Sequence, residues 1–163
     1  MEPHRTGKPR IYLRSRKEVQ RRAKDIEAAI RKAFEGAEFT TGGGVDGVVH
    51  HSISLDSSDK GHLIAMDHDR VVGALFHVPI KRHPGEEFTG VGWLFTSPSL
   101  PKDVRRELGN RLVRRFHDDA RRLGYKRIVT SIGTVDGVAF LGKHHGYYQS
   151  PDPNLTGYWV KDL

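Results

Sequence analysis

The chain has 163 residues, of which 36% are hydrophobic and 29% charged, and these proportions predict a soluble globular protein. It contains no cysteine, which excludes disulfides, thiolate zinc sites and cysteine nucleophiles. The net charge of +7 at pH 7 favours an anionic partner, either nucleic acid or a phosphorylated ligand. No apolar run approaches the ~20 residues of a membrane span, and the polar, basic N-terminus lacks the apolar core of a signal peptide. The sequence therefore predicts a cytoplasmic protein without membrane contact.

Residues 1–10 are polar and basic and predict a flexible tail, after which a single domain is expected over 11–163. A helix follows early in that domain. Ser15 and Glu18 have the spacing of a capping box, in which each side chain accepts from the other residue's amide. The apolar residues beyond them recur at helical spacing, and Gly36 is typical of a helix end.

The rest of the chain alternates strands and helices. Residues 38–60 are rich in Gly, Asp and Ser and predict loops, with a short helix or strand near 48–53. A polar turn at 67–69 and a loop at 81–87 separate apolar runs. Strands are expected at 11–13, 62–66, 70–78, 88–96, 126–132, 147–148 and 157–160, and further helices at 110–123 and 135–145. This order predicts an α/β fold with a central, mostly antiparallel mixed sheet flanked by helices.

A short basic segment, 104–109, precedes the helix at 110–123 and reads Val-Arg-Arg-Glu-Leu-Gly. We expect this segment to be a turn that leads into the helix. The first amides of a helix have no intrahelical acceptor, and the helix dipole favours an anion beside them. Arg105 and Arg106 can add charge-assisted hydrogen bonds. The pattern therefore predicts a phosphate-binding site next to the sheet.

The stretch 104–113 resembles the pyrophosphate loop of the GNAT superfamily of acyl-CoA N-acyltransferases. That loop reads Gln/Arg-x-x-Gly-x-Gly/Ala and is followed by two apolar helical positions. Gly109 matches the final glycine, and Leu112 and Val113 match the apolar pair. The resemblance implies the GNAT fold, with acetyl-CoA or a related acyl-CoA as acyl donor; the spacing of the histidines predicts no metal.

Two positions depart from the pattern of that loop. Val104 stands where Gln or Arg is usual, and Glu107 replaces the first glycine. A carboxylate aimed at a pyrophosphate would be repulsive. Glu107 is therefore expected to turn away from the ligand or to pair with Arg105 or Arg106.

The resemblance also implies which residues hold the cofactor. In GNAT proteins the fourth and fifth strands diverge, the thioester enters the gap, and backbone amides of the fourth strand hold the pantetheine. Carried over to this chain, the pantetheine contacts are Leu94, Phe95 and Thr96, and the pyrophosphate contacts are Arg105, Arg106, Leu108, Gly109 and Asn110.

The catalytic residues usual in the family are missing here. The acid is commonly a tyrosine four residues before a Gly-Phe pair; with Gly146-Tyr147 as that pair, Gly142 takes its place. The usual asparagine is replaced by Val135 or Asp136. The substitutes that we name are Glu87 as base and His145 or Tyr148 as proton donor, with Glu86, His144 and Tyr147 as neighbouring alternatives. The remaining histidines have no metal-ligand spacing.

These features predict an N-acetyltransferase that moves an acyl group directly from acetyl-CoA to a small amine or a protein amino group. One alternative is a GNAT-fold module that binds acyl-CoA, or a pantetheine carrier, without acetylating amines; Gly142 and Glu107 favour it. The alternative that the protein binds nucleic acid is supported by its charge alone, since the sequence contains no recognised nucleic-acid-binding signature. The closing strands would also allow a homodimer.

Overall fold

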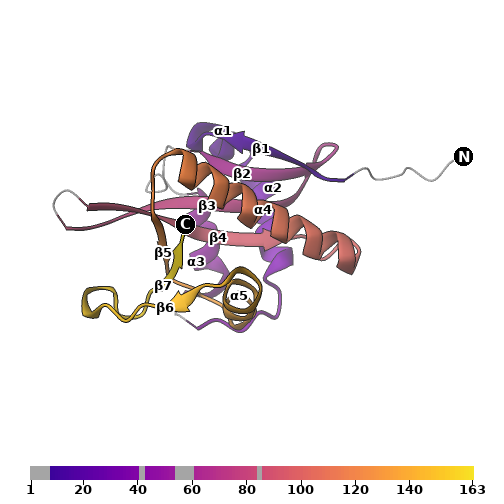
Figure 1. The fold of residues 1–163 in the computed structure, drawn as a ribbon. Helices are drawn as coiled ribbons and strands as arrows, with labels where there is room; N and C mark the ends of the chain where they lie inside the picture. Colours follow the sequence, from indigo (N-terminus) through magenta and orange to yellow (C-terminus); the bar gives the residue numbers. More distant parts are fainter. Residues whose placement is uncertain (1–7, 41–42, 54–60, 84–85) are drawn as a thin grey trace, which may run out of the picture.

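The computed structural model describes residues 8–40, 43–53, 61–83 and 86–163 (Figure 1). Its strands are β1 (Arg10–Arg14), β2 (His62–Asp67), β3 (Arg70–His83), β4 (Glu86–Thr96), β5 (Arg127–Thr130), β6 (Tyr148–Gln149) and β7 (Trp159–Asp162). Its helices are α1 (Arg16–Arg21), α2 (Ala23–Ala33), α3 (Gly44–Ile53), α4 (Lys102–Arg122) and α5 (Val135–Ala139), with a π-helical turn at Phe140–His144 and a 3₁₀ turn at Pro153–Leu155. The predicted α/β fold with a mixed, mostly antiparallel sheet is confirmed.

The sheet has seven strands in the order β1-β2-β3-β4-β5-β7-β6. All neighbours are antiparallel except β4 and β5, which run parallel and pair only at Thr89 and Ile128. Beyond that pair the two strands separate. The hydroxyl of Thr130 still donates to the Val91 carbonyl over 2.7 Å, so the separation begins after this hydrogen bond. A gap in the sheet follows from this topology.

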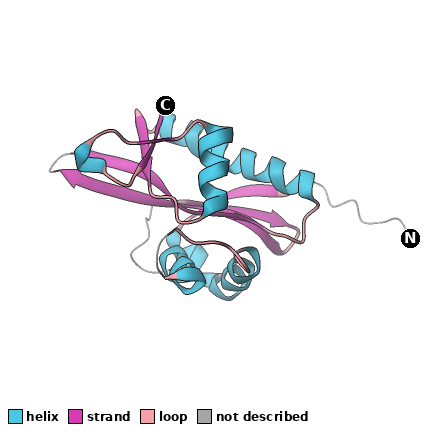
Figure 2. Ribbon diagram, turned by 90° about the horizontal axis from the view of Figure 1, so that it is seen from below, coloured by secondary structure: helices cyan, strands magenta, loops and turns pink. Residues whose placement is uncertain are grey.

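Helices cover both faces of the sheet (Figure 2). One core cluster joins α4 to strand residues such as Leu63 and Leu75. The other joins α2 and α3 to Ile64 and Phe76, the next residues along the same strands. Successive side chains of a strand point to opposite faces, so β2 and β3 supply apolar residues to both cores. This explains why their sequences are continuous apolar runs rather than alternating ones.

The early helix is divided in two. The capping box at Ser15 and Glu18 is present as predicted, but Arg22 leaves the helical conformation (φ −103°, ψ 20°) and separates α1 from α2. The uncertain segment at 48–53 is helical and belongs to α3. The predicted loop at 81–87 is largely strand, because β3 and β4 continue to pair there, with Lys81 opposite Glu87.

The helix expected at 110–123 begins eight residues earlier, at Lys102, so the predicted turn at 104–109 is wrong. Val104, Leu108 and Leu112 follow one another at four-residue spacing and all pack in the core beneath α4. This apolar row extends the helix toward Pro101, whose carbonyl accepts from the Arg105 amide over 2.9 Å.

The tail predicted at 1–10 lies mostly outside the described residues. Its last residues are held in place: β1 starts at Arg10, and the Pro9 carbonyl accepts from Arg111 over 3.0 Å. In the described part of the chain, no helix is long and apolar enough to span a bilayer.

Candidate active site

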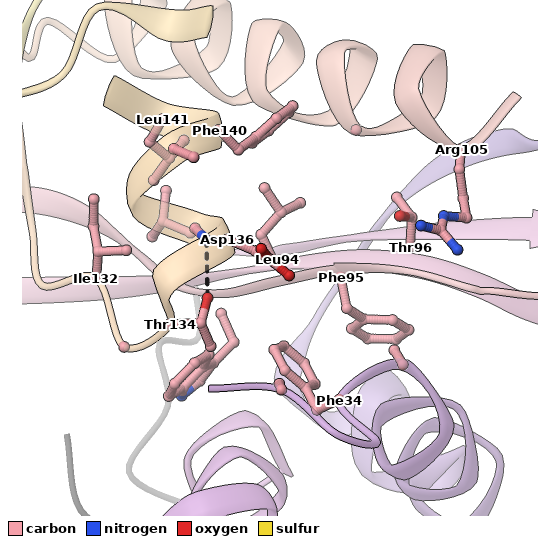
Figure 3. A pocket seen from close by; sticks show the side chains of 18 of the residues that line it. Phe34, Leu94, Phe95, Thr96, Arg105, Ile132, Thr134, Asp136, Phe140 and Leu141 are labelled. Atoms are coloured by element: carbon pink, nitrogen blue, oxygen red, sulfur yellow. Dashed lines mark hydrogen bonds between the residues drawn. The ribbon is translucent and has the colours of Figure 1, made fainter. Parts of the chain in front are cut away.

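A cavity of about 500 Å³ lies where β4 and β5 diverge (Figure 3). Its walls come from both faces of the sheet. On one face of the sheet the walls are formed by α5, the π-helical turn and the first two turns of α4. On the other face they include the end of α2. Residues 91–96 and 130–134 form the strand edges between these walls. The cavity therefore passes through the gap in the sheet.

The α4 end of the cavity is cationic. Lys102, Arg105, Arg106 and Gly109 line it, and their spacing places them on one side of the helix. The N-cap residue is Pro101, which makes no side-chain capping bond. The first amides of α4 have no intrahelical acceptor. Three cationic side chains at the positive end of the helix dipole thus line one site suited to phosphate.

Most of the predicted cofactor-binding residues lie at this cavity: Leu94, Phe95, Thr96, Arg105, Arg106 and Gly109 line it. Leu108 and Asn110 do not. Leu108 is buried in the core under α4, and Oδ1 of Asn110 accepts a hydrogen bond from His145 Nε2 over 2.9 Å. The amides of 105–110 are inside an α-helix and bond to carbonyls one turn earlier. The arginine side chains can reach a phosphate, but these amides cannot.

Glu107 turns away from the cavity, which was one of the two expected outcomes. Its carboxylate forms an ion pair with Lys8, with 3.0 Å between Nζ and Oε1. The expected alternative partners, Arg105 and Arg106, instead face the cavity. Helix geometry accounts for this. Each residue turns the helix by about 100°, so Glu107 lies on a different side of α4 from Arg106 and Gly109, which line the cavity. The carboxylate does not oppose an anion bound at α4.

Of the three predicted catalytic residues, the two whose side chains are described, His145 and Tyr148, do not line the cavity. His145 packs against Phe140 and Asn110, and the exposed Tyr148 donates to Asp162 over 2.8 Å at the outer strand β6. The Glu87 backbone belongs to β4, and its side chain lies outside the described part of the structure.

Two other titratable residues line the cavity, Asp136 and His144. The sequence left Val135 and Asp136 as alternatives at one position. The structure distinguishes them, because Asp136 lines the cavity and Val135 is 48% exposed outside it. Thr134 caps α5 by accepting from the Gly137 amide over 3.0 Å, and this bond fixes the start of the helix that carries Asp136 (Figure 3).

The described residues that line the cavity include no tyrosine, and Gly142 stands where the family usually has one. A β-carbon built on Gly142 would contact Trp159 and the Tyr147 carbonyl, at 3.7 and 3.8 Å. The π-helical turn adds a residue to this part of the helix. As a result Phe140, Leu141 and His144 are the residues that this turn contributes to the cavity.

A buried polar pair supports the same turn from behind. The Tyr147 hydroxyl and His117 Nε2, on α4, are 2.8 Å apart, and both side chains are buried. The pKa of His117 is lowered to about 4, chiefly by burial and also by the nearby His145 and Lys161. Burial also raises the pKa of Tyr147 well above its usual value. Both groups are therefore neutral near pH 7, and their role is structural.

The wall on the α2 face is apolar and aromatic. The rings of Phe34 and Trp93 meet edge to face, with centroids 5.7 Å apart and an interplanar angle of 83°. Phe95 lies 6.5 Å from Phe34, and Ala33 and Ala37 complete the wall. From the sequence, Phe95 was expected to contact the cofactor through its backbone and, with Trp93, to form core or pocket wall on this strand. The partner from α2 was missed, because Phe34 is far away along the chain.

A short backbone pairing fastens this wall to the far side of the gap. Phe39 forms an isolated antiparallel bridge with Thr134. The Thr40 amide donates to the Gly133 carbonyl over 2.8 Å, and the Val135 amide donates to the Glu38 carbonyl over 3.1 Å. The segment after α2 is thus tied to the β5–α5 connection. Among the described residues, no group of three His, Asp or Glu side chains is placed to hold a metal ion.

No protein-family model and no curated protein sequence matches this chain. Solved structures do match. YhbS from Escherichia coli, a GNAT family N-acetyltransferase in complex with CoA, is 18% identical with a TM-score of 0.67, over 99% of this chain and 85% of that one. A GNAT family acetyltransferase from Brucella melitensis in complex with acetyl-CoA is 14% identical with a TM-score of 0.65, over 94% and 88%. The chain has the GNAT fold.

A third similar structure is the PaiA N-acetyltransferase from Thermoplasma acidophilum in complex with coenzyme A. It is 12% identical, and the match covers 94% of this chain and 99% of that one with a TM-score of 0.66. In each comparison nearly the whole chain aligns, so the GNAT fold includes the strands on both sides of the gap as well as the helices that line the cavity.

Proposed function

We propose that this GNAT-fold protein transfers an acetyl group from acetyl-CoA to a primary amine. The observation that carries the proposal is the cavity between β4 and β5, which joins a cationic helix end on one face of the sheet to an apolar wall on the other. A donor with phosphates and a thioester would fit the first face, and an acceptor would approach from the second.

The donor would bind with its pyrophosphate at the start of α4. Lys102, Arg105 and Arg106 supply charge there, and the first amides of the helix supply hydrogen bonds. The pantetheine would run along the free edge of β4 at 94–96, where the missing β5 partner leaves backbone groups available. The CoA and acetyl-CoA complexes of the similar GNAT structures support this assignment.

The reaction would proceed by direct transfer, since the chain has no cysteine to carry the acyl group. The amine nitrogen attacks the thioester carbonyl carbon, the new C–N bond forms, and the C–S bond breaks. The amine loses one proton, and the departing thiolate gains one to give CoA. The gap holds both reactants in one geometry, which by itself accounts for much of the rate.

Among the described residues, His144 is the best candidate to protonate the thiolate. It lines the cavity, whereas His145 and Tyr148 do not. We therefore propose His144 in their place. Glu87 remains our proposed base from its position on β4. Asp136, on α5, is placed to accept a hydrogen bond from the donor or the acceptor.

The second candidate is a GNAT-fold module that binds acyl-CoA without transferring the acyl group. Gly142 favours it, because the described cavity lining contains no tyrosine to act as acid. Such a module would bind acetyl-CoA with the same residues and would release no CoA when amines are added.

The two candidates are separated by measuring CoA release from acetyl-CoA with a thiol reagent across a panel of primary amines. The protein has no thiol of its own, so the signal reports CoA alone. Amine-dependent release that falls in Arg105→Ala/Arg106→Ala supports the transferase. Binding of acetyl-CoA without release with any amine supports the module.

A further inference from the structure

The acceptor half of the cavity differs chemically from the donor half. Trp93 and Phe95 belong to the core cluster of the α2 face, and Leu94 between them packs on the α4 face. Figure 3 shows Phe34 and Phe95 on one side of β4 and Phe140 and Leu141 on the other. An acceptor that enters from the α2 face would meet aromatic rings before it reaches the thioester.

Charge is confined to the donor half. The charged or titratable side chains of the described cavity lining are Lys102, Arg105, Arg106, Asp136 and His144, and all belong to α4, α5 or the π-helical turn. The α2 face contributes Ala33, Phe34 and Ala37 instead. A second ammonium group on the acceptor, or a phosphate, would lose hydration against these three residues, and none of them offers a charged partner.

The aromatic wall is also held in shape. Phe34, Phe39 and Trp93 contact one another at 5.7 to 6.4 Å between centroids, in tilted and edge-to-face arrangements. The bridge between Phe39 and Thr134 fastens the cluster to the β5 side. An aryl group can extend such a cluster with the same offset or edge-to-face geometry.

We propose that the acceptor is a primary amine carried on an aryl or arylalkyl body with no second charge. This inference rests on the proposed transferase function and adds the substrate class to it. The apolar wall would also assist the reaction, because desolvation disfavours the ammonium form of the acceptor and favours the neutral nucleophile. The ammonium proton passes through the proposed base to solvent before the nitrogen attacks the thioester, and the products are the N-acetyl amine and CoA.

The first test compares three amines at saturating acetyl-CoA: 2-phenylethylamine, ethylamine and spermidine. Ethylamine is the matched control, because it has the same amine on the same two carbons without the ring. We expect kcat/KM for 2-phenylethylamine to exceed both others by at least about tenfold, the factor that burial of one aromatic ring supplies. A higher kcat/KM for spermidine would overturn the inference and leave the transferase function intact.

The second test locates the amine. Ala37→Leu adds volume to the apolar wall, and Ala28→Leu adds the same volume at an exposed position of α2 outside the cavity. We expect Ala37→Leu to raise KM for 2-phenylethylamine about tenfold or more without changing the acetyl-CoA Kd. Ala28→Leu is expected to change neither. Equal KM values in the two variants would place the amine elsewhere and contradict the inference.

A third test does not depend on turnover. The chain has two tryptophans, so Trp159→Phe leaves Trp93 as the only fluorescent indole. With CoA bound, 2-phenylethylamine is expected to change the Trp93 emission saturably, and ethylamine at the same concentrations is not. CoA binding without any response to 2-phenylethylamine would overturn the substrate class alone. Absence of CoA binding would instead contradict the proposed function.

Discussion

His144 and His145 are sequence neighbours with different surroundings. His144 lines the cavity, and His145 is hydrogen-bonded to Asn110 and packed edge to face on Phe140. If His144 protonates the departing thiolate, His144→Gln removes a general acid and is expected to lower kcat about 100-fold while the acetyl-CoA Kd stays within about twofold. Steady-state kinetics and a binding titration measure the two quantities.

His145→Gln is the matched control for this prediction, because it makes the same change one residue away and outside the cavity. We expect it to lower kcat only a few-fold. If the His145 substitution lowers kcat as much as the His144 substitution, His144 has no special role and the proton donor must be sought elsewhere.

His117 makes stability depend on pH. Its pKa is lowered to about 4 in the folded protein, chiefly by burial, whereas an unfolded histidine titrates near 6.5. Between these values the unfolded chain binds more protons than the folded one, so the free energy of unfolding falls as the pH falls from about 6.5 to about 4. Above pH 6.5 the neutral His117 makes its full contribution to the free energy of unfolding. Complete loss of that contribution at low pH would lower the free energy of unfolding by on the order of 3 kcal/mol at most.

Chemical denaturation at pH 7 and pH 4.5 tests this expectation. His117→Gln keeps a hydrogen-bonding side chain next to Tyr147 and cannot titrate. The variant is expected to lose less stability over the same interval than the unchanged protein does. An identical loss in both proteins would show that other groups cause the acid sensitivity.

At the scale of elements, the connection between β5 and α5 is fitted closely against the aromatic wall. A β-carbon at Gly133 would overlap the Trp93 indole, with Cζ3 at 3.0 Å and another ring atom closer still. Gly133→Ala is therefore expected to destabilise the protein by about 1–3 kcal/mol, the usual effect of overpacking. Because Trp93 must move, KM for the amine should change more than the acetyl-CoA Kd.

Gly47→Ala provides the control for Gly133→Ala. Gly47 lies within α3, and a β-carbon there would meet no atom within 4 Å. Since alanine favours helix over glycine by about 1 kcal/mol, this substitution should leave stability equal or higher. Thermal unfolding of both variants checks the pair. A Gly133→Ala protein as stable as Gly47→Ala would contradict the close packing of Trp93.

The elements show what sequence could and could not predict. The strands β2 and β3, the capping box before α1 and the end of α4 followed from local apolar patterns and from residues such as Ser15 and Gly124. The start of α4 did not, because Val104 and Leu108 belong to its buried row only once the sheet is beneath them. The ends of β3 and β4 likewise depend on pairing with each other.

The residues of the candidate site also divide into those that the sequence predicts and those that only the folded structure identifies. Arg105 and Arg106 were predicted from their own segment and face the cavity. Of the aromatic wall, Trp93 and Phe95 were expected as core or pocket wall, but Phe34 was not, since it meets Trp93 only after α2 packs on the sheet. Asp136 was one of two alternatives at the place of the missing asparagine, and the structure separates it from Val135 because Asp136 lines the cavity.

At the scale of the whole molecule, the gap between β4 and β5 connects two chemically different faces. The net charge of +7 matches a polyphosphate ligand, and three of the cations converge at the start of α4. The opposite face is covered by α2 and α3 and provides the apolar wall (Figure 2). Donor and acceptor would then approach from opposite faces and meet in the gap.

The phosphates of acetyl-CoA are proposed to bind at the start of α4. Calorimetric titration of acetyl-CoA into three proteins examines this site: the unchanged protein, Arg105→Ala/Arg106→Ala, and the control Arg121→Ala/Arg122→Ala, which removes two positive charges at the other end of α4. We expect saturable binding that Arg105→Ala/Arg106→Ala weakens at least about tenfold, since charged hydrogen bonds contribute about 1.5–3 kcal/mol each, and that the control variant leaves within about twofold. Equal affinity in all three proteins, or no binding at millimolar ligand, would rule out a phosphate site at this helix end.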